Sequence, residues 1–279
     1  VLVDEAHGSH FAAGVDDQLP ASALRAGADL VVHSLQKSAA GLAQTAVLWL
    51  RGQRVDPDRI RRSLGLLQTT SPSALLLASC EAALQQWQQP RGRDRLRQRL
   101  AESRQLKTSL VADGIPLLDS QDPLRLVLHT GSAGISGLDA DDWFMSHGLV
   151  AELPEPATLT FCLGLAKQRK LRGQMRKHWR ALNDAHQGKT AFAPFEPPPL
   201  PLVSQPATSP CQAWNAGRRS IPLDAAEGEV AAELVCPYPP GIPLLIPGEQ
   251  LDGSRLNWLQ RQRTLWGEQI PEQLMVIEG

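Results

Sequence analysis

The sequence lacks the features that mark membrane, secreted and disulfide-stabilised proteins. No apolar run approaches the roughly 20 residues of a membrane-spanning helix, and no N-terminal signal peptide is recognisable. The four cysteines have neither metal-site nor disulfide spacing, which favours a reducing cytoplasm. The formal net charge of -1 gives no reason to expect nucleic acid or an anionic membrane as a partner.

An initiator methionine is also missing, because the first residue is Val1. The chain begins inside an apolar strand pattern without any lead-in, so we expect it to be a fragment of a longer protein. Its 279 residues, 42% of them hydrophobic, are enough for a globular core and for more than one domain.

What the sequence does contain is a strand pattern followed by a lysine among small residues. The run Leu30–Val32 is typical of a buried strand, His33 and Ser34 end it, and Lys37 follows. Residues 38–41 are Ser, Ala, Ala and Gly, which leave access to the lysine amine. Such a lysine suits a Schiff base with a carbonyl cofactor, although a surface lysine in a loop would give the same pattern.

A second apolar strand pattern begins the chain and ends in the carboxylate of Asp4. With a helix expected over Ala21–Ala28, the two strands form a βαβ unit, which places both strand ends at one edge of a parallel sheet, where ligands bind. A carboxylate and a lysine at that edge are the two protein groups that pyridoxal phosphate (PLP) needs. The acid keeps the pyridinium nitrogen protonated, and the amine holds the aldehyde.

Several short segments, in order over nearly the whole chain, carry a resemblance to a known family. They are Asp4-Glu-Ala-His7, Ser34-Leu-Gln-Lys37, Gln44–Leu48, Thr69-Thr-Ser-Pro72, Cys236–Pro243 and Pro247-Gly-Glu249. Together they resemble the fold-type-I Orn/Lys/Arg decarboxylases. One position departs from the family pattern, since Gln36 stands where the family usually has a histidine before the Schiff-base lysine.

The resemblance implies an α/β fold in three parts. The first is the C-terminal part of a PLP fold-type-I (aspartate-aminotransferase-like) large domain, over residues 1–92. A small α+β domain over 93–190, a proline-rich linker over 191–210 and a C-terminal α+β domain over 211–279 follow. The family's phosphate-cradling loop and its ring-stacking side chain would lie upstream of Val1.

The resemblance also implies roles at the first strand and at the lysine. Lys37 would form the Schiff base, Asp4 would bind the ring nitrogen, and Ala6 would pack flat under the ring. His7 matches a family position near the ring and substrate, and its alternative role is that of a structural histidine. We expect the two neighbouring histidines, at positions 10 and 33, to be structural.

Further roles are implied for hydroxyl and thiol groups. Ser34 would donate to the cofactor phosphate, or serve only as a turn hydroxyl. Thr70, within Thr69–Ser71, would reach the phosphate of the neighbouring subunit, and this cluster would also cap the next helix. Cys236 and Glu249 belong to a motif that approaches the active site in this family. Cys236 would help to protonate the carbanion, or would be plain packing.

The function that follows from the resemblance is PLP-dependent decarboxylation of lysine, arginine or ornithine to the amine, in polyamine metabolism. The resemblance further implies a homodimer or higher homo-oligomer in the cytoplasm, without a metal. Two alternatives remain, a catalytically incomplete fragment and an aminotransferase, although no arginine clamp for a retained α-carboxylate can be assigned. The start also fits the Walker B pattern of DEAH-type helicases, but the Ser-Ala-Thr and Gln-Arg-Gly-Arg motifs are absent.

Periodicity and capping signals predict the remaining elements. An N-cap at Asp56 opens a helix over 57–66, and a longer helix starts at Ser71-Pro72 and is broken at 90–92. The arginine-rich segment 91–104 is expected to be a solvated helix face instead of a nucleic-acid patch. Other helices are expected over 141–147, 167–186 and 255–266, and strands over 45–50, 124–129 and 159–163.

Overall fold

The computed structural model describes residues 1–192, 196–199, 206–237, 241–264, 267 and 270–278. The chain divides into two compact units, one of residues 1–126 with 162–176 and one of residues 127–161 with 177–279. The domain boundaries expected from the sequence remain predictions. No helix within the described ranges combines the length and the apolar character needed to cross a bilayer.

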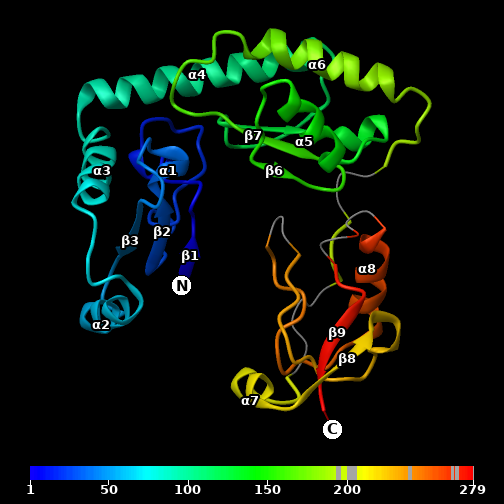
Figure 1. Cartoon of the computed structure of the whole chain (residues 1–279). Coiled ribbons are helices and arrows are strands. Elements are labelled where there is room, and N and C mark those ends of the chain that lie inside the picture. Colours follow the sequence, from blue (N-terminus) through cyan, green and yellow to red (C-terminus); the bar gives the residue numbers. More distant parts are fainter. Residues whose placement is uncertain (193–195, 200–205, 238–240, 265–266, 268–269, 279) are drawn as a thin grey trace. The chain divides into compact units, whose positions relative to one another are not determined.

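The first unit is built on a three-stranded sheet of β1 (Leu2–Asp4), β2 (Leu30–Ser34) and β3 (Ala46–Leu50) (Figure 1). β1 runs parallel to β2, with Asp4 opposite Val32, and β3 runs antiparallel to β2. The parallel pair brings the ends of β1 and β2 to one edge of the sheet, as the sequence predicts. A one-turn helix, α1 (Leu35–Ser38), begins directly where β2 ends.

The crossover between β1 and β2 is not the helix expected over Ala21–Ala28, so that prediction is wrong. Consecutive turns take its place, in which Ala26 N donates to Ser22 O and Ala28 N to Ala23 O, each at 3.0 Å. Gly27 has a left-handed φ of 95°. A positive φ ends helical geometry, and the segment before it is too short to repay helix nucleation.

Three longer helices follow, α2 (Pro57–Leu67), α3 (Ala74–Gln85) and α4 (Pro90–Ala112). The predicted cap of α2 is confirmed, because the Asp56 side chain accepts from Asp58 N. The predicted start of α3 at Ser71-Pro72 is wrong, since the helix begins after the proline with Ser73 as its N-cap. Proline disfavours helical geometry in the residue before it, which keeps Ser71 outside the helix.

The arginines of α4 are less solvated than the sequence suggests. Arg93 donates to the carbonyl of Ala13 at 2.7 Å, and Arg97 donates to the carbonyl of Val15 at 3.1 Å. Arg99 is buried, and its Nε donates to Gly164 O at 2.9 Å. Arg93 and Arg97 therefore bind the loop that contains the 3₁₀ turn η1 (Phe11–Ala13). The prediction of a solvated face is wrong for the buried Arg99, whereas the Arg97 side chain is 50% exposed and agrees with it.

A four-stranded sheet has the order β4-β5-β7-β6. Two helices accompany these strands, and α5 is capped by Ser136, whose side chain accepts from Asp139 N. Both helices differ from the predicted limits, since α5 begins four positions before residue 141 and α6 begins after residue 167. The bounds are β4 (Leu117–Leu118), β5 (Arg125–Leu128), η2 (Thr130–Ala133), α5 (Gly137–Ser146), β6 (Leu153–Pro154), β7 (Leu159–Cys162) and α6 (Leu171–Ala185).

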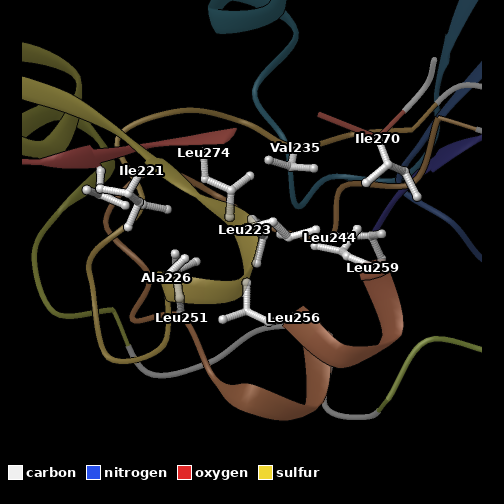
Figure 2. Packing of buried hydrophobic residues seen from close by; sticks show 13 residues of the cluster. Ile221, Leu223, Ala226, Val235, Leu244, Leu251, Leu256, Leu259, Ile270 and Leu274 are labelled. Atoms are coloured by element: carbon white, nitrogen blue, oxygen red, sulfur yellow. The ribbon is translucent and has the colours of Figure 1, made fainter. Parts of the chain in front are cut away.

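The C-terminal residues of the second unit have their own hydrophobic core. The antiparallel strands β8 and β9 carry Ile221 and Leu274, and α8 turns Leu256 and Leu259 toward them (Figure 2). Both leucines are buried on the helix expected over 255–266, whereas Trp266, in the last part of that range, and part of the predicted linker lie outside the described residues. The bounds are α7 (Pro210–Asn215), β8 (Arg218–Pro222), η3 (Leu223–Ala225), α8 (Gly253–Arg263) and β9 (Gln273–Ile277).

Candidate active site

The sheet edge at the ends of β1 and β2 gathers most of the residues predicted to bind a cofactor. Lys37 Nζ lies 3.0 Å from His7 Nε2. Ala6 N donates to Asp4 Oδ1 at 2.9 Å, and Ser34 N donates to Ala6 O at 3.2 Å. Lys37 and Asp4 are both exposed. The chain therefore presents an amine, a carboxylate and an imidazole together at an accessible edge.

The His7 imidazole is held in its neutral form. Burial lowers its pKa most, the positive charges of Arg125 and then Lys37 lower it further, and the result is a pKa of about 4. The carboxylates of Asp4 and Asp122 oppose this shift without cancelling it. A neutral imidazole accepts a hydrogen bond from a lysine ammonium, whereas an imidazolium would face it as a second donor with the same charge.

Glu5 joins β1 to His33 in β2 and to the crossover at Ala23, a role that was not predicted from the sequence. One of its oxygens lies 2.7 Å from His33 Nε2, and the other accepts from Ala23 N at 2.9 Å. His33 Nδ1 accepts from Trp49 Nε1 at 3.0 Å. This fixes the neutral tautomer with hydrogen on Nε2, so that His33 donates to Glu5. The structural role expected of His33 agrees with these contacts. Glu5 directly follows Asp4 at the end of the first strand pattern, and a second acid at that place could have indicated a role for Glu5 at this edge.

Gln36, where the chain departs from the family pattern, binds the backbone. Its side-chain oxygen accepts from Gln44 N, and Gln44 has a left-handed φ of 71°. Ala40 in the same loop is also left-handed, with a φ of 57°. Such backbone is costly for residues other than glycine and needs local support. Gln36 therefore stabilises the loop that follows Lys37.

Two predicted residues are not part of this cluster of contacts. Thr70 is exposed between α2 and α3. The prediction that its segment caps the next helix is wrong, because Ser73 holds the cap and Thr69 Oγ1 instead accepts from Ser71 N. Cys236 is half-buried in the second unit. The phosphate-binding role of Thr70 and the catalytic role of Cys236 remain predictions.

The chemistry of this edge fits PLP. The Lys37 amine is exposed, as a group that must reach an aldehyde has to be. Ser34 is the N-cap residue of α1, yet its side chain makes no capping hydrogen bond, so the cap does not occupy its hydroxyl. Ala6 stands between Asp4 and His7 in the sequence, and its methyl group is small enough to lie against a flat ring.

Two family models match the sequence. Residues 1–121 match "Orn/Lys/Arg decarboxylase, major domain", and residues 193–271 match "Orn/Lys/Arg decarboxylase, C-terminal domain". Among curated relatives, the arginine decarboxylase of Bacillus subtilis (strain 168) is 32% identical over 278 residues, and that of Halalkalibacterium halodurans is 30% identical over 272 residues. Each alignment covers 93% of this chain and 55% of the relative. The chain thus spans about half the length of these relatives.

Solved structures of lysine decarboxylases share the fold. The constitutive enzyme of Escherichia coli superposes with a TM-score of 0.68 at 17% identity, covering 89% of this chain and 49% of that one. The Francisella novicida enzyme gives a TM-score of 0.69 at 14% identity, with the same coverages. The α/β fold-type-I class expected from the sequence is confirmed.

Proposed function

The chain belongs to the Orn/Lys/Arg decarboxylase family, and on that premise we propose that its Lys37 edge serves PLP-dependent decarboxylation of a basic amino acid to the amine. The observation that carries the proposal is the 3.0 Å contact between Lys37 and His7, with Asp4 at the end of the adjacent strand. We propose arginine as the preferred substrate, because relatives that align over 93% of the chain bear the name arginine decarboxylase. Lysine and ornithine are the alternatives.

Four residues of the chain would hold its own cofactor. Lys37 would bind its aldehyde, Asp4 its ring nitrogen and Ser34 its phosphate, while Ala6 would lie against the ring face. Thr70 would reach the phosphate of the cofactor in the neighbouring subunit. When bound, PLP supplies a ring that accepts the electron pair left behind as carbon dioxide departs. The carboxylate of Asp4 holds a proton at the ring nitrogen through a charge-assisted hydrogen bond, which keeps the ring electron-poor.

Four further residues would orient the Lys37 amine, support its strand end or donate a proton. Neutral His7 accepts a hydrogen bond from the Lys37 amine, so that amine is held in place without a second positive charge facing it. Glu5 and His33 hold the strand end that carries these groups. We propose Cys236 as the residue that returns a proton to the substrate carbon, since a thiol can act as a general acid.

We further propose that the enzyme acts as a homodimer or higher homo-oligomer in the cytoplasm and contributes to polyamine metabolism. Large apolar side chains on α2 and α3 support a partner there. Leu66 and Leu67 are 87% and 85% exposed, and Leu75 is 69% exposed. Large apolar side chains with this degree of exposure are what a partner would cover.

Product analysis tests the proposal. The full-length enzyme, supplied with PLP, is given arginine, lysine and ornithine in separate reactions, and carbon dioxide and amines are measured. We expect the amine of arginine to form fastest, and none to form with Lys37→Ala. A keto acid as the main product would point to an aminotransferase. No product from a cofactor-loaded, folded enzyme would favour the catalytically incomplete alternative.

A further inference from the structure

A chain of side-chain hydrogen bonds crosses the first sheet and ends on the crossover between β1 and β2. Trp49 Nε1 donates to His33 Nδ1 at 3.0 Å, and His33 Nε2 lies 2.7 Å from Glu5 Oε2. The second Glu5 oxygen, Oε1, accepts from Ala23 N at 2.9 Å. Three side chains therefore join β3, β2, the residue after β1 and the crossover.

The direction of each bond in this chain is fixed. The Trp49 indole can only donate, so His33 Nδ1 is the acceptor and His33 Nε2 carries the hydrogen that Glu5 accepts. Because Ala23 N also donates, Glu5 must accept on both oxygens. An ionised carboxylate does so, whereas a glutamine amide has one acceptor and one donor end. Glutamine at position 5 would set a donor against a donor, either at Ala23 or, after His33 changes tautomer, at Trp49.

The central bond of this chain lies in closely packed surroundings. The His33 and Glu5 side chains are 1% and 14% exposed. Gly8 leaves room for this position of Glu5, because a Cβ at Gly8 would lie only 2.5 Å from Glu5 Cγ. A buried donor that loses its acceptor costs free energy, so we expect a mismatch in the chain to displace the strand ends.

The predicted cofactor groups lie on the opposite face of the sheet from this chain. Asp4 is in register with Val32, and Ser34 follows Val32 by two positions, so Asp4 and Ser34 share one face. His33 points to the other face, where it meets Trp49. The chain therefore acts on the site through the backbone and not by contact with a ligand.

The bond between Glu5 and His33 lies where the two strand ends are joined. Glu5 N donates to the carbonyl of Val32 at 3.0 Å. Asp4 directly precedes Glu5, and α1, which contains Lys37, begins two residues after His33. The spacing between the Asp4 carboxylate and the Lys37 amine therefore depends on how these strand ends are held.

We propose that Glu5, His33 and Trp49 act as one unit of positioning residues for the lysine site. Through the strand ends, this unit sets the spacing between Asp4 and Lys37, which would bind opposite ends of the cofactor ring. The carboxylate of Glu5 is needed as a double acceptor and not as a charge facing the cofactor. The inference rests on the proposed function for the identity of the cofactor, whereas the directions of the hydrogen bonds exist without one.

Cofactor affinity in the full-length protein tests the proposal. PLP is titrated into each protein, and the absorbance of lysine-bound cofactor gives the Kd. Glu5→Gln and His33→Leu should each raise the Kd on the order of tenfold, the effect of one lost hydrogen bond. His33→Gln should restore most of the affinity lost in His33→Leu, because glutamine can accept from Trp49 and donate to Glu5.

A purely structural role would lower the melting temperature of these variants and leave the Kd of the folded proteins unchanged, which would overturn the proposal. Equal losses of affinity in His33→Gln and His33→Leu would also overturn it. If Glu5→Gln does not fold, Trp49→Phe decides in its place. It removes only the first donor, far from the lysine, and an unchanged Kd in that variant would contradict the proposal.

The tautomer of His33 is measured in the wild type without cofactor. NMR of the imidazole nitrogens, with His33 assigned by its loss in His33→Gln, should show hydrogen on Nε2 and none on Nδ1. Hydrogen on Nδ1 would overturn the proposal. Failure of the proposed function is recognised separately, because the wild type would then show no lysine-bound absorbance with PLP, whatever the tautomer of His33.

Discussion

The C-terminal core contains a buried ion pair, and the loss of stability expected on breaking it can be estimated from the structure. Arg255 and Glu249 are 2% and 3% exposed, and Arg255 Nη1 lies 2.8 Å from Glu249 Oε2. Arg255 also donates to the carbonyls of Leu244 and Gln250, at 3.0 and 3.1 Å, and pairs with Asp252. The guanidinium thus fastens the segment before α8 to the first turn of that helix.

Glu249→Gln removes the buried negative charge while keeping the shape of the side chain. Loss of one partner from a buried pair costs about 3–5 kcal/mol, because the other charge is left uncompensated. Asp252 still faces Arg255, although its side chain is 43% exposed, so we expect a loss near the lower limit, about 3 kcal/mol. The large penalty follows from burial and not from the number of contacts.

The free energy of unfolding is measured by urea denaturation, followed by the fluorescence of the chain's tryptophans, among which Trp258 packs against this core. Glu229→Gln is the matched control, because its partner Arg219 is 44% exposed. A surface pair of that kind contributes at most about 1 kcal/mol. If both variants lost the same small amount of stability, the reasoning from burial would be refuted.

Three further predictions concern the lysine site and the core. Asp4→Asn should lower kcat on the order of a hundredfold, because the ring nitrogen loses its charged partner, and near-normal turnover would show that Asp4 only shapes the turn. Gln36→His should leave the pH profile of kcat superimposable on the wild type between about pH 5 and 9, because Gln36 supports the backbone of Gln44; a new ionisation with faster turnover would instead indicate a proton carrier. Leu259→Ala, at a fully buried position of α8, should cost about 2–5 kcal/mol in urea denaturation, and a loss below 1 kcal/mol would contradict the packing in Figure 2.

The lysine edge could be predicted from the sequence because the direction of the strands fixes it. Parallel strands end at the same edge of a sheet, so Asp4 at the end of β1 and Lys37 after β2 were expected at one edge. The cap of α2 was predictable for a simpler reason, since Asp56 and Pro57 are neighbours in sequence.

The rest of the site depends on contacts between residues that are distant in sequence. Nothing in the sequence near His10 indicates that it contacts Asp122, and Arg125 is simply the second residue of the strand predicted over 124–129. Asp122-Pro123 is a turn signal, and the Asp122 side chain does accept from Leu124 N. The turn at Asp122 could be predicted, but the contact of its side chain with His10 could not.

Two errors in the predicted elements have local causes, and a third has a distant one. The helix expected to start at Ser71-Pro72 begins later, because a proline restrains the residue before it. The crossover at Ala21–Ala28 has helix-forming residues, but Gly27 follows too soon for a helix to form. The arginines of α4 looked solvated because a charge pattern alone does not reveal carbonyl partners such as Ala13.

The central claim is that the Lys37 amine holds the cofactor, and covalent trapping tests it most directly. The full-length enzyme is incubated with PLP and reduced with borohydride, which converts a cofactor held through a lysine amine into a stable secondary amine. Peptide mass spectrometry then locates the modification, with Lys37→Ala as the control. We predict the label on the peptide that contains Lys37 and its absence from that peptide in the variant. A label on another lysine, or none in a folded enzyme that decarboxylates, would contradict the account.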